Sequence, residues 1–236
     1  MTYSKILKLA GFIILWLGAG TTTQAMTRIE GTRLIYPAKD KEISVRVTND
    51  SAEKIILQAW ISAAKEEIHD IPFAIIQPLV ELDQQQVHIL RILYMGEGLP
   101  SDKESLFLLN VVEAPLKPQN ENNIQMAIRQ KLKLFFRPTD LQGSLLDCIA
   151  GLTWKVKNGS SVEVTNTCAF HLSLVDVQIE FDGRATLLSE YTLLKPREKQ
   201  YFTTPNTRIP KDARIKFLEI NDSGLRTVHK QKLRNI

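Results

Sequence analysis

The chain has 236 residues, of which 24% are charged, and a formal net charge of +4 at pH 7. That bias is too weak to indicate nucleic acid or an anionic membrane surface as a partner. The four histidines are scattered without a metal-ligand spacing, and the sequence contains no G-x-S-x-G, phosphate-binding glycine loop or C-x-x-C motif. We therefore predict a protein that is not an enzyme and that uses no metal or cofactor.

The N-terminus is typical of an export signal. Lys5 and Lys8 precede an apolar core at residues 11–18, and residues 23–25 give a small-x-small cleavage pattern. The core is shorter than the roughly 20 residues that a membrane-spanning helix needs, so a membrane anchor is the less favoured alternative. We expect a signal peptide at 1–25 and, after its cleavage, a protein outside the cytoplasm that does not insert into the membrane.

The first half of the mature chain consists of short apolar runs separated by turn residues. In the run at 42–47, Ile43, Val45 and Val47 alternate with polar residues, which places them on one face of a strand. Further strands are expected at 28–36, 54–61, 73–82, 87–94, 105–112 and from residue 124 onward. Regularly spaced short strands without long helical periodicity predict a β-sandwich.

A second set of strands follows the proline at 138. It is expected at 152–156, 162–166, 172–181, 197–202, 213–220 and 225–230, with a hairpin signal at Asn158-Gly159 and a turn at 221–224. We therefore predict an all-β protein with a first domain at 26–138, a linker at 139–147 and a second domain at 148–236. Each domain has the size of a sandwich of about 100 residues.

The two cysteines, Cys148 and Cys168, lie close together in the sequence. In an oxidising compartment such a pair indicates a disulfide. A bridge that closes a loop of this length stabilises a fold by about 3 kcal/mol on the chain-entropy model. The alternative is a pair of buried free thiols that behave as small apolar side chains.

The segment from residue 124 to 138, IQMAIRQKLKLFFRP, combines two patterns. Ile124, Met126 and Ile128 alternate, which places them on one face of a strand, and a basic and aromatic run follows. Arg33 and Lys133 are cations inside apolar strands, a position that is more often solvent-facing than functional. If these two cations, on the first and last strands of the domain, converge in a cleft, they would bind a carboxylate through charge-assisted hydrogen bonds.

Six ordered pieces of the mature chain resemble the periplasmic pilus chaperones, the PapD-like family. In chain order they are TRLIYP at 32–37, QAW at 58–60, the strand and turn from Pro72 to Asp83, LPSDKESLF at 99–107, KLKLFFRP at 131–138 and INDSG at 220–224. The resemblance implies two immunoglobulin-like β-sandwich domains arranged at an angle with a cleft between them.

The resemblance also implies a function. Such a protein is a periplasmic chaperone that binds, folds and caps pilus or fimbrial subunits by donor-strand complementation, then delivers them to an outer-membrane usher. The alternative is a structural fimbrial subunit or adhesin, for which residues 26–30 are too short to serve as a polymerising extension. Self-association of the free form through its donor strand stays open, because an exposed apolar edge favours it.

By position in the motifs, the resemblance assigns roles to eight residues. They are Arg33 and Lys133 as ligands of the subunit's C-terminal carboxylate, Ile124, Met126 and Ile128 as donor-strand residues, and Glu104, Arg137 and Asp222 as an interdomain charge cluster. The short connection at 110–123 resembles the short-loop subgroup that serves rod-type pili.

The chain departs from the family pattern in the first domain. Gln77 occupies the place of the first proline of a T-P-P motif, so a family cis-proline near Pro78 is not carried over. The turn at 82–85 lacks the family's proline and glycine. In addition, strict alternation places Lys133 on the face opposite Ile128, so a bulge or strong twist is expected between them if both contact a ligand.

Overall fold

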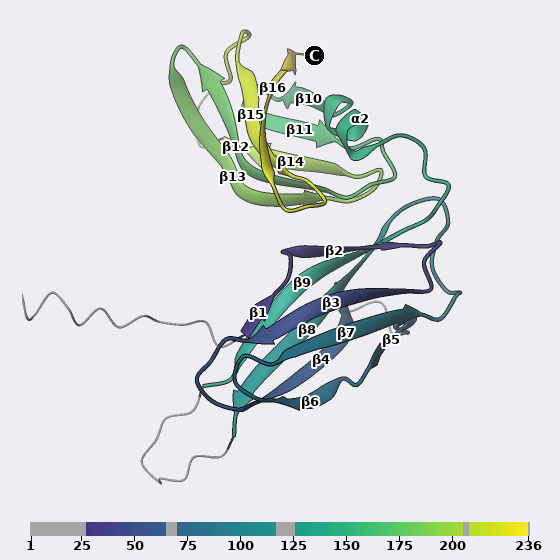
Figure 1. Ribbon diagram of the computed structural model, residues 1–236. Helices are drawn as coiled ribbons and strands as arrows, with labels where there is room; N and C mark the ends of the chain where they lie inside the picture. The colour runs from purple at the N-terminus through teal and green to yellow at the C-terminus, as the bar shows by residue number, and fades with distance from the viewer. Residues whose placement is uncertain (1–26, 65–69, 117–125, 205–207, 236) are drawn as a thin grey trace, which may run out of the picture.

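The computed structural model describes residues 27–64, 70–116, 126–204 and 208–235. The expected signal peptide and Ile124 lie outside these residues. Within the described parts the chain forms four sheets, which pair into two β-sandwiches (Figure 1). The prediction of an all-β fold with two immunoglobulin-like domains is confirmed. No helix among the described residues is long and apolar enough to cross a membrane.

The first domain packs two sheets against each other. The β9 sheet has the order β2-β9-β8-β4-β6, and the β3 sheet has the order β1-β3-β7-β5. The strands are β1 (Thr27–Ile29), β2 (Arg33–Pro37), β3 (Glu42–Asn49), β4 (Ile55–Ala63), β5 (Phe73–Ile76), β6 (Leu79–Leu82), β7 (Val87–Tyr94), β8 (Ser105–Pro115) and β9 (Ile128–Arg137).

The core of the first domain centres on a group of aromatic rings. The buried Tyr36 ring lies within about 6 Å of the rings of Phe73, Tyr94 and Phe136. The Tyr36 hydroxyl donates to the backbone carbonyl of Lys41 and accepts from the backbone N–H of Tyr94, so its polar end is satisfied. This core fixes β2 beside β9, the two strands that carry Arg33 and Lys133.

Two of the expected strands are each divided between the sheets. The run at 28–36 becomes β1 and β2, with Gly31 at φ 89° between them. The run at 73–82 becomes β5 and β6, and Gln77, at φ 52°, redirects the chain. A backbone in this left-handed region breaks the strand, and apolar content alone does not show such a break. The described residues contain no cis peptide bond, near Pro78 or elsewhere.

The second domain packs the β11 sheet, of order β14-β11-β10-β17, against the β12 sheet, of order β13-β12-β15-β16. Its core contains the buried rings of Trp154, Phe202 and Phe217. Its strands are β10 (Thr153–Lys157), β11 (Ser161–Thr165), β12 (Leu172–Phe181), β13 (Arg184–Leu194), β14 (Lys199–Thr203), β15 (Arg214–Ile220), β16 (Arg226–Lys232) and β17 (Arg234–Asn235).

A short helix, α2 (Leu145–Ala150), opens the second domain. It begins inside the segment that we expected to be an irregular linker. Ser144 caps it: its hydroxyl accepts from the backbone N–H of Asp147, whose carboxylate accepts from the backbone N–H of Ser144. A disulfide joins Cys148 to Cys168, with Cα atoms 5.7 Å apart, which confirms the predicted pairing. The domain boundaries themselves stay a prediction.

Candidate functional site

β9 has an open edge along its first half. It pairs with β8 over all but its last residue, from the pair Glu113 and Ile128 to the pair Ser105 and Phe136. On its other side the parallel partner β2 covers only residues 133–137. Among the described residues, the backbone from 128 to 132 therefore has no strand on that side, and the N–H and C=O groups that point to that side are free to pair with an added strand.

The side chains of β9 alternate between two environments. Leu132, Leu134 and Phe136 are buried in the core of the first domain. Ile128 continues the same face but is 40% exposed, and Met126, just before the strand, is 69% exposed. This face therefore changes from core to open apolar surface toward the start of the strand.

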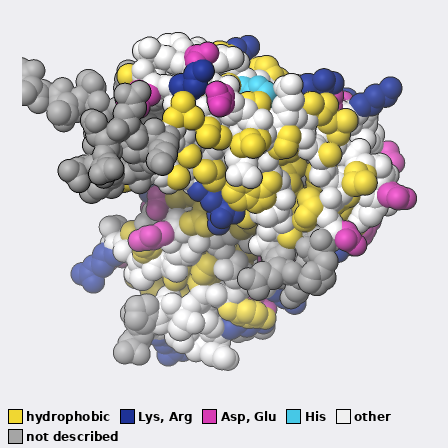
Figure 2. Space-filling model, turned by 90° about the horizontal axis from the view of Figure 1, so that it is seen from below, with side chains coloured by type: hydrophobic (Ala, Val, Ile, Leu, Met, Phe, Trp, Pro, Cys, Tyr) yellow, Lys and Arg dark blue, Asp and Glu magenta, His cyan; other side chains and the backbone are white. Residues whose placement is uncertain are grey.

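Exposed apolar side chains are not confined to that segment. Figure 2 shows hydrophobic side chains gathered over much of the underside of the molecule, with charged side chains among them. In the first domain the most exposed of them include Leu79, Met95 and Met126. Extensive apolar surface of this kind is typical of a protein that binds other proteins.

The pairing of β8 with β9 has no register shift, so no bulge separates Ile128 from Lys133. Of the bulge or strong twist expected if both residues contact one ligand, the bulge is absent. They lie on opposite faces of the strand, as the alternation predicted. The open edge ends where β2 begins, at the pair formed by Arg33 and Lys133.

Arg33 points toward the second domain. Its Nη1 donates to the backbone carbonyl of Ile220 at 2.8 Å and to the hydroxyl of Ser173 at 3.4 Å. Its guanidinium carbon lies 5.9 Å from the centre of the Phe135 ring. Burial lowers the pKa of Arg33, an effect that the nearby Tyr191 and Asp222 oppose. Its Nε is buried and has no hydrogen-bond partner among the described residues.

Lys133 lies beside Arg33 and is half-buried. Its Nζ sits 4.8 Å from the centre of the Tyr191 ring on β13, a cation–π contact between the two domains. No carboxylate in the described part of the chain lies within ion-pair distance of either Arg33 or Lys133. The two residues predicted to bind a carboxylate therefore lie side by side. Neither is neutralised by a carboxylate of the described residues, so both can donate hydrogen bonds to an anion.

The predicted interdomain charge cluster also comes together. Arg137 Nη1 and Nη2 donate to the two carboxylate oxygens of Asp222 at 2.6 and 2.9 Å, and its Nε donates to Glu104 at 2.7 Å. The Glu104 side chain is only 1% exposed, and its other oxygen accepts from the backbone N–H of His171 at 2.8 Å. Burial acts to lower the pKa of Arg137, but the hydrogen bonds and charges of Asp222 and Glu104 outweigh it and raise the pKa.

Two further contacts between the domains were not foreseen from the sequence. Arg197 donates to the Asp102 carboxylate at 2.7 Å, and Gly224 packs against Thr32. A Cβ at Gly224 would lie 2.4 Å from the Thr32 hydroxyl oxygen, and its φ is 81°. Only glycine fits there, which explains the glycine that closes the INDSG motif. The role of His171 was also missed, because its backbone N–H, not its ring, supplies the main contact with Glu104.

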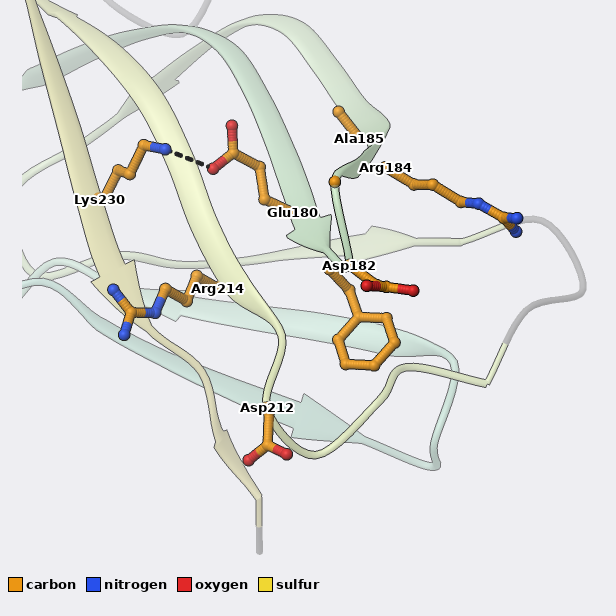
Figure 3. Close-up of a pocket in the computed structure, with 9 residues that line it drawn as sticks. Glu180, Asp182, Arg184, Ala185, Asp212, Arg214 and Lys230 are labelled. Carbon is orange, nitrogen blue, oxygen red and sulfur yellow. Dashed lines mark hydrogen bonds and ion pairs between the residues drawn. The ribbon is translucent and has the colours of Figure 1, made fainter.

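The second domain has a separate cavity of about 600 Å³ at the far end of the β12 sheet (Figure 3). It is lined by Glu180, Phe181, Asp182, Gly183, Arg184, Ala185, Asp212, Arg214 and Lys230. Lys230 donates to Glu180 at 2.7 Å, and the cations and carboxylates of the lining balance in number. The cavity therefore has no net charge that would select an ion of one sign. The described residues hold no group of histidines, cysteines and carboxylates suited to a metal ion.

Comparison with known protein families matches both domains. Residues 26–142 match the family described as pili and flagellar-assembly chaperone, PapD N-terminal domain. Residues 147–231 match the family described as pili assembly chaperone PapD, C-terminal domain. The chain belongs to this family of pilus-assembly chaperones.

Individual relatives agree with this assignment. The chain is 37% identical to the chaperone protein FimB/FhaD of Bordetella pertussis over 66% of this chain and 68% of the relative. It is 31% identical to the probable fimbrial chaperone LpfB of Escherichia coli O157:H7 over 83% of each. The predicted function of a fimbrial chaperone is confirmed, and the alternative of a structural subunit is not favoured.

Solved structures give the same picture. The CupB2 chaperone of Pseudomonas aeruginosa superposes with a TM-score of 0.75 at 28% identity, over 88% of this chain and all of that one. The structure of the Salmonella enterica SafA pilin in complex with the SafB chaperone superposes with a TM-score of 0.73 at 25% identity, over 89% of this chain and 96% of the other.

Proposed function

We propose that this fimbrial chaperone acts in the periplasm, where it lends the open edge of β9 to a pilus subunit and holds the subunit's C-terminal carboxylate between Arg33 and Lys133. It then passes the subunit to an outer-membrane usher. One observation carries the proposal: the open edge ends where Arg33 and Lys133 lie in register, and neither forms an ion pair with a carboxylate of the described residues. The neighbouring complex of a pilin with its chaperone supports subunits as partners.

The pairing of β2 limits where an added strand ends. A chain paired beside residues 128–132 runs along β9 until it meets the first residue of β2, which is Arg33. An added strand cannot continue past that point, because β2 already occupies the edge. A subunit whose chain finishes there presents its terminal carboxylate to Arg33 and Lys133, so opposite faces of β9 serve one ligand without a bulge.

The state of Arg33 suits this role. Its Nη1 is already held by Ile220 and Ser173, so little reorganisation is needed when an anion arrives. Its buried Nε has no partner in the described parts of the chain, and a carboxylate oxygen would satisfy this donor. Partial burial also strengthens the attraction between the cations and the carboxylate.

The apolar part of the binding comes from the start of the strand. Met126 and Ile128 are exposed in the free protein and would be buried in the groove of a subunit, with Ile124 before them. Burying each such side chain contributes at most about 1.5–3 kcal/mol. We propose a binding protein without catalytic activity, because the site offers a strand edge and an anion anchor and no nucleophile beside a base.

The proposal is tested by replacing the anchor residues. Arg33→Ala and Lys133→Ala should each give a folded, exported protein that fails to co-purify with the subunits of its own operon. Loss of one partner of a desolvated charge pair costs about 2–5 kcal/mol. The measurement is the yield of chaperone–subunit complex from periplasmic extracts.

Lys131→Ala is the matched control, because Lys131 lies on the same face of β9 and is exposed. It should leave the yield of complex nearly unchanged. A normal yield from either anchor variant would remove that residue from the site. An equal loss in all three variants would show that net charge matters and that position does not.

A further inference from the structure

A row of apolar side chains crosses the outer face of the β12 sheet beside the anchor. Tyr191 pairs with Val175, Val175 pairs with Leu218, and Leu218 pairs with Val228, so the row spans β13, β12, β15 and β16. The alternate positions along these strands, such as Phe217, are buried in the domain core. The row therefore faces outward, and Tyr191 is 43% and Val228 54% exposed.

Polar contacts border this row on both sides. On the side of the first domain, the hydroxyl of Ser173 and the backbone carbonyl of Ile220 accept hydrogen bonds from Arg33. On the other side, Lys216 and Lys230 form ion pairs with Glu180. An apolar strip between polar margins has the layout of a binding surface.

The near end of the row is continuous with the carboxylate anchor. The Tyr191 ring lies 4.8 Å from Lys133 Nζ, and β13 runs along the side of the second domain that faces the first (Figure 1). An extended chain advances about 3.3 Å per residue. When a terminal carboxylate lies between Arg33 and Lys133, the side chain of the last or next-to-last residue therefore reaches Tyr191.

The far end of the row lies too far from the anchor for the last residues of a bound chain to contact it. Strands in a sheet are about 4.8 Å apart, so Val228, three strands from Tyr191, is roughly 14 Å away from it. The side chains close enough to contact the end of a bound chain are Tyr191, Val175 and Leu218. A basic side chain at that place would be repelled by Lys133, whereas an apolar one would cover the exposed ring.

We propose that Tyr191, with Val175 and Leu218 beside it, binds an apolar side chain next to the terminal carboxylate of the captured subunit. This inference rests on the proposed function, because it takes the carboxylate to be held by Arg33 and Lys133. It adds a criterion of selection: the chaperone distinguishes subunits by the residue at their C-terminus as well as by the groove that receives the donor strand.

The test uses short fluorescent peptides of alternating valine and threonine that end in leucine or in serine. Each is made with a free carboxylate and with a terminal amide, and its binding to the mature chaperone is measured by fluorescence anisotropy. The wild-type protein should bind the leucine-ended acid about tenfold more tightly than the serine-ended acid. Tyr191→Thr, which suits a strand, should reduce this preference to less than about twofold.

Three further variants sharpen the result. Tyr191→Phe keeps the ring and should keep the preference, Val175→Thr should reduce it, and Val228→Ser, beyond reach, should leave it unchanged. A preference that survives in both Tyr191→Thr and Val175→Thr would overturn the inference, as would a wild-type protein that binds both acids equally.

Other outcomes separate this inference from the proposed function. If the amides bind as tightly as the acids, the carboxylate anchor is wrong and both proposals fall; absence of binding by any peptide has the same meaning. If the acids bind only through the anchor, with no effect of Tyr191, this inference falls alone. A last outcome is that the chaperone self-associates in sedimentation, that Tyr191→Thr weakens this self-association, and that the peptides show no preference for the terminal residue. The row would then bind a second copy of this chain, and the inference is overturned.

Discussion

Arg137 and Lys133 lie on the same face of β9, and both contact the second domain, but only the charge of Arg137 is neutralised by carboxylates of the described residues. Arg137 is neutralised by Asp222 and Glu104 through three short hydrogen bonds. Lys133 and its neighbour Arg33 contact a ring, a hydroxyl and a backbone carbonyl, with no carboxylate partner among the described residues. The contacts of Arg137 with the second domain are therefore complete in the free protein, whereas Arg33 and Lys133 have no anionic partner in the part of the chain that the structure describes.

The difference indicates a division of labour along one strand. A buried ion pair with all its hydrogen bonds made fixes geometry, because displacing either partner leaves a charge without compensation. Arg137 therefore holds the second domain where Ser173, Ile220 and Tyr191 face the open cations. In the proposed function, Arg33 and Lys133 are positioned by that arrangement and keep their charge for the subunit's carboxylate.

The largest expected effect lies on the apolar side of the site. Replacing Ile124, Met126 and Ile128 together with serine should nearly abolish capture of subunits, since each burial contributes at most about 1.5–3 kcal/mol. The melting temperature of the free chaperone should barely change, because Met126 and Ile128 are exposed. The measurements are the yield of complex and a thermal melt.

The matched control for this triple change replaces three exposed apolar residues elsewhere in the first domain, Leu79, Val87 and Met95, with serine. It should leave capture largely intact. If the donor-strand variant instead unfolds the first domain, these residues belong to its core, and the donor-strand interpretation of the segment fails.

The charge cluster gives the next largest effect, and it falls on stability. Arg137→Ala removes the one cation that pairs with both Glu104 and Asp222, and it leaves the buried Glu104 with the hydrogen bond from His171 but without its arginine. We expect the free energy of unfolding to fall by about 3–5 kcal/mol, measured by urea denaturation. Arg33→Ala should change it far less, which would separate the closed contact from the open one.

Arg91→Ala is the control for this prediction. Arg91 also donates to both oxygens of a carboxylate, that of Glu42, but its side chain is 50% exposed. Exposed pairs contribute about 0–1 kcal/mol. Equal losses in Arg137→Ala and Arg91→Ala would show that the interdomain cluster has no special structural role.

Much of this site was accessible from the sequence, for identifiable reasons. Alternation predicted that Ile128 and Lys133 lie on opposite faces, and the motifs predicted that Arg33 and Lys133 lie together. The end of the open edge was not predictable, because it depends on where β2 joins β9, a contact between residues far apart in the chain. The local pattern therefore led us to expect a bulge or strong twist if both residues contact one ligand, and the pairing of β8 with β9 contains no bulge.

The missed strand β13 illustrates the same limit. Its first half, from Arg184, is exposed on both faces, so it carries no apolar period from which a strand is predicted. Tyr191 lies on this strand, and its contact with Lys133 was consequently not foreseen. The short helix α2 was also missed, since its capping residues Ser144 and Asp147 lie in a segment that resembles a linker.

Glu113 on β8 is a buried acidic group that differs from Glu104, because it has no cation beside it among the described residues. It is 2% exposed, and its Oε2 has no hydrogen-bond partner among the described residues. Burial raises the pKa of Glu113 to about 7, whereas a free glutamate has a pKa of about 4.3. Because the folded pKa is the higher one, its contribution to stability is full below about pH 4 and is lost as the pH rises through about 7.

Glu113→Gln should remove this dependence on pH. We expect the variant to be more stable than the wild type at pH 8, by on the order of 2 kcal/mol, and to lack the fall in stability between about pH 5 and 8. Urea denaturation at several pH values measures both effects. Glu97→Gln, at an exposed glutamate, is the control, and parallel profiles for all three proteins would show that Glu113 does not titrate in this range.

The smallest expected effect concerns a turn remote from the domain boundary, so it should change the stability of the chaperone without changing its binding of subunits. Gln85 has φ 59°, a conformation that favours glycine, in the turn where the family pattern has one. The turn is held by Asn49, whose carbonyl accepts from the backbone N–H of Gln85. Gln85→Gly should therefore raise the free energy of unfolding by about 0.5 kcal/mol, since relief of strain slightly exceeds the entropy that glycine gains on unfolding.

Gln84→Gly, in the same turn without a positive φ, should lower the free energy of unfolding by about 0.5–1 kcal/mol. Urea midpoints that shift in the same direction for both variants would contradict the assignment of strain to Gln85, and neither variant should alter the yield of chaperone–subunit complex.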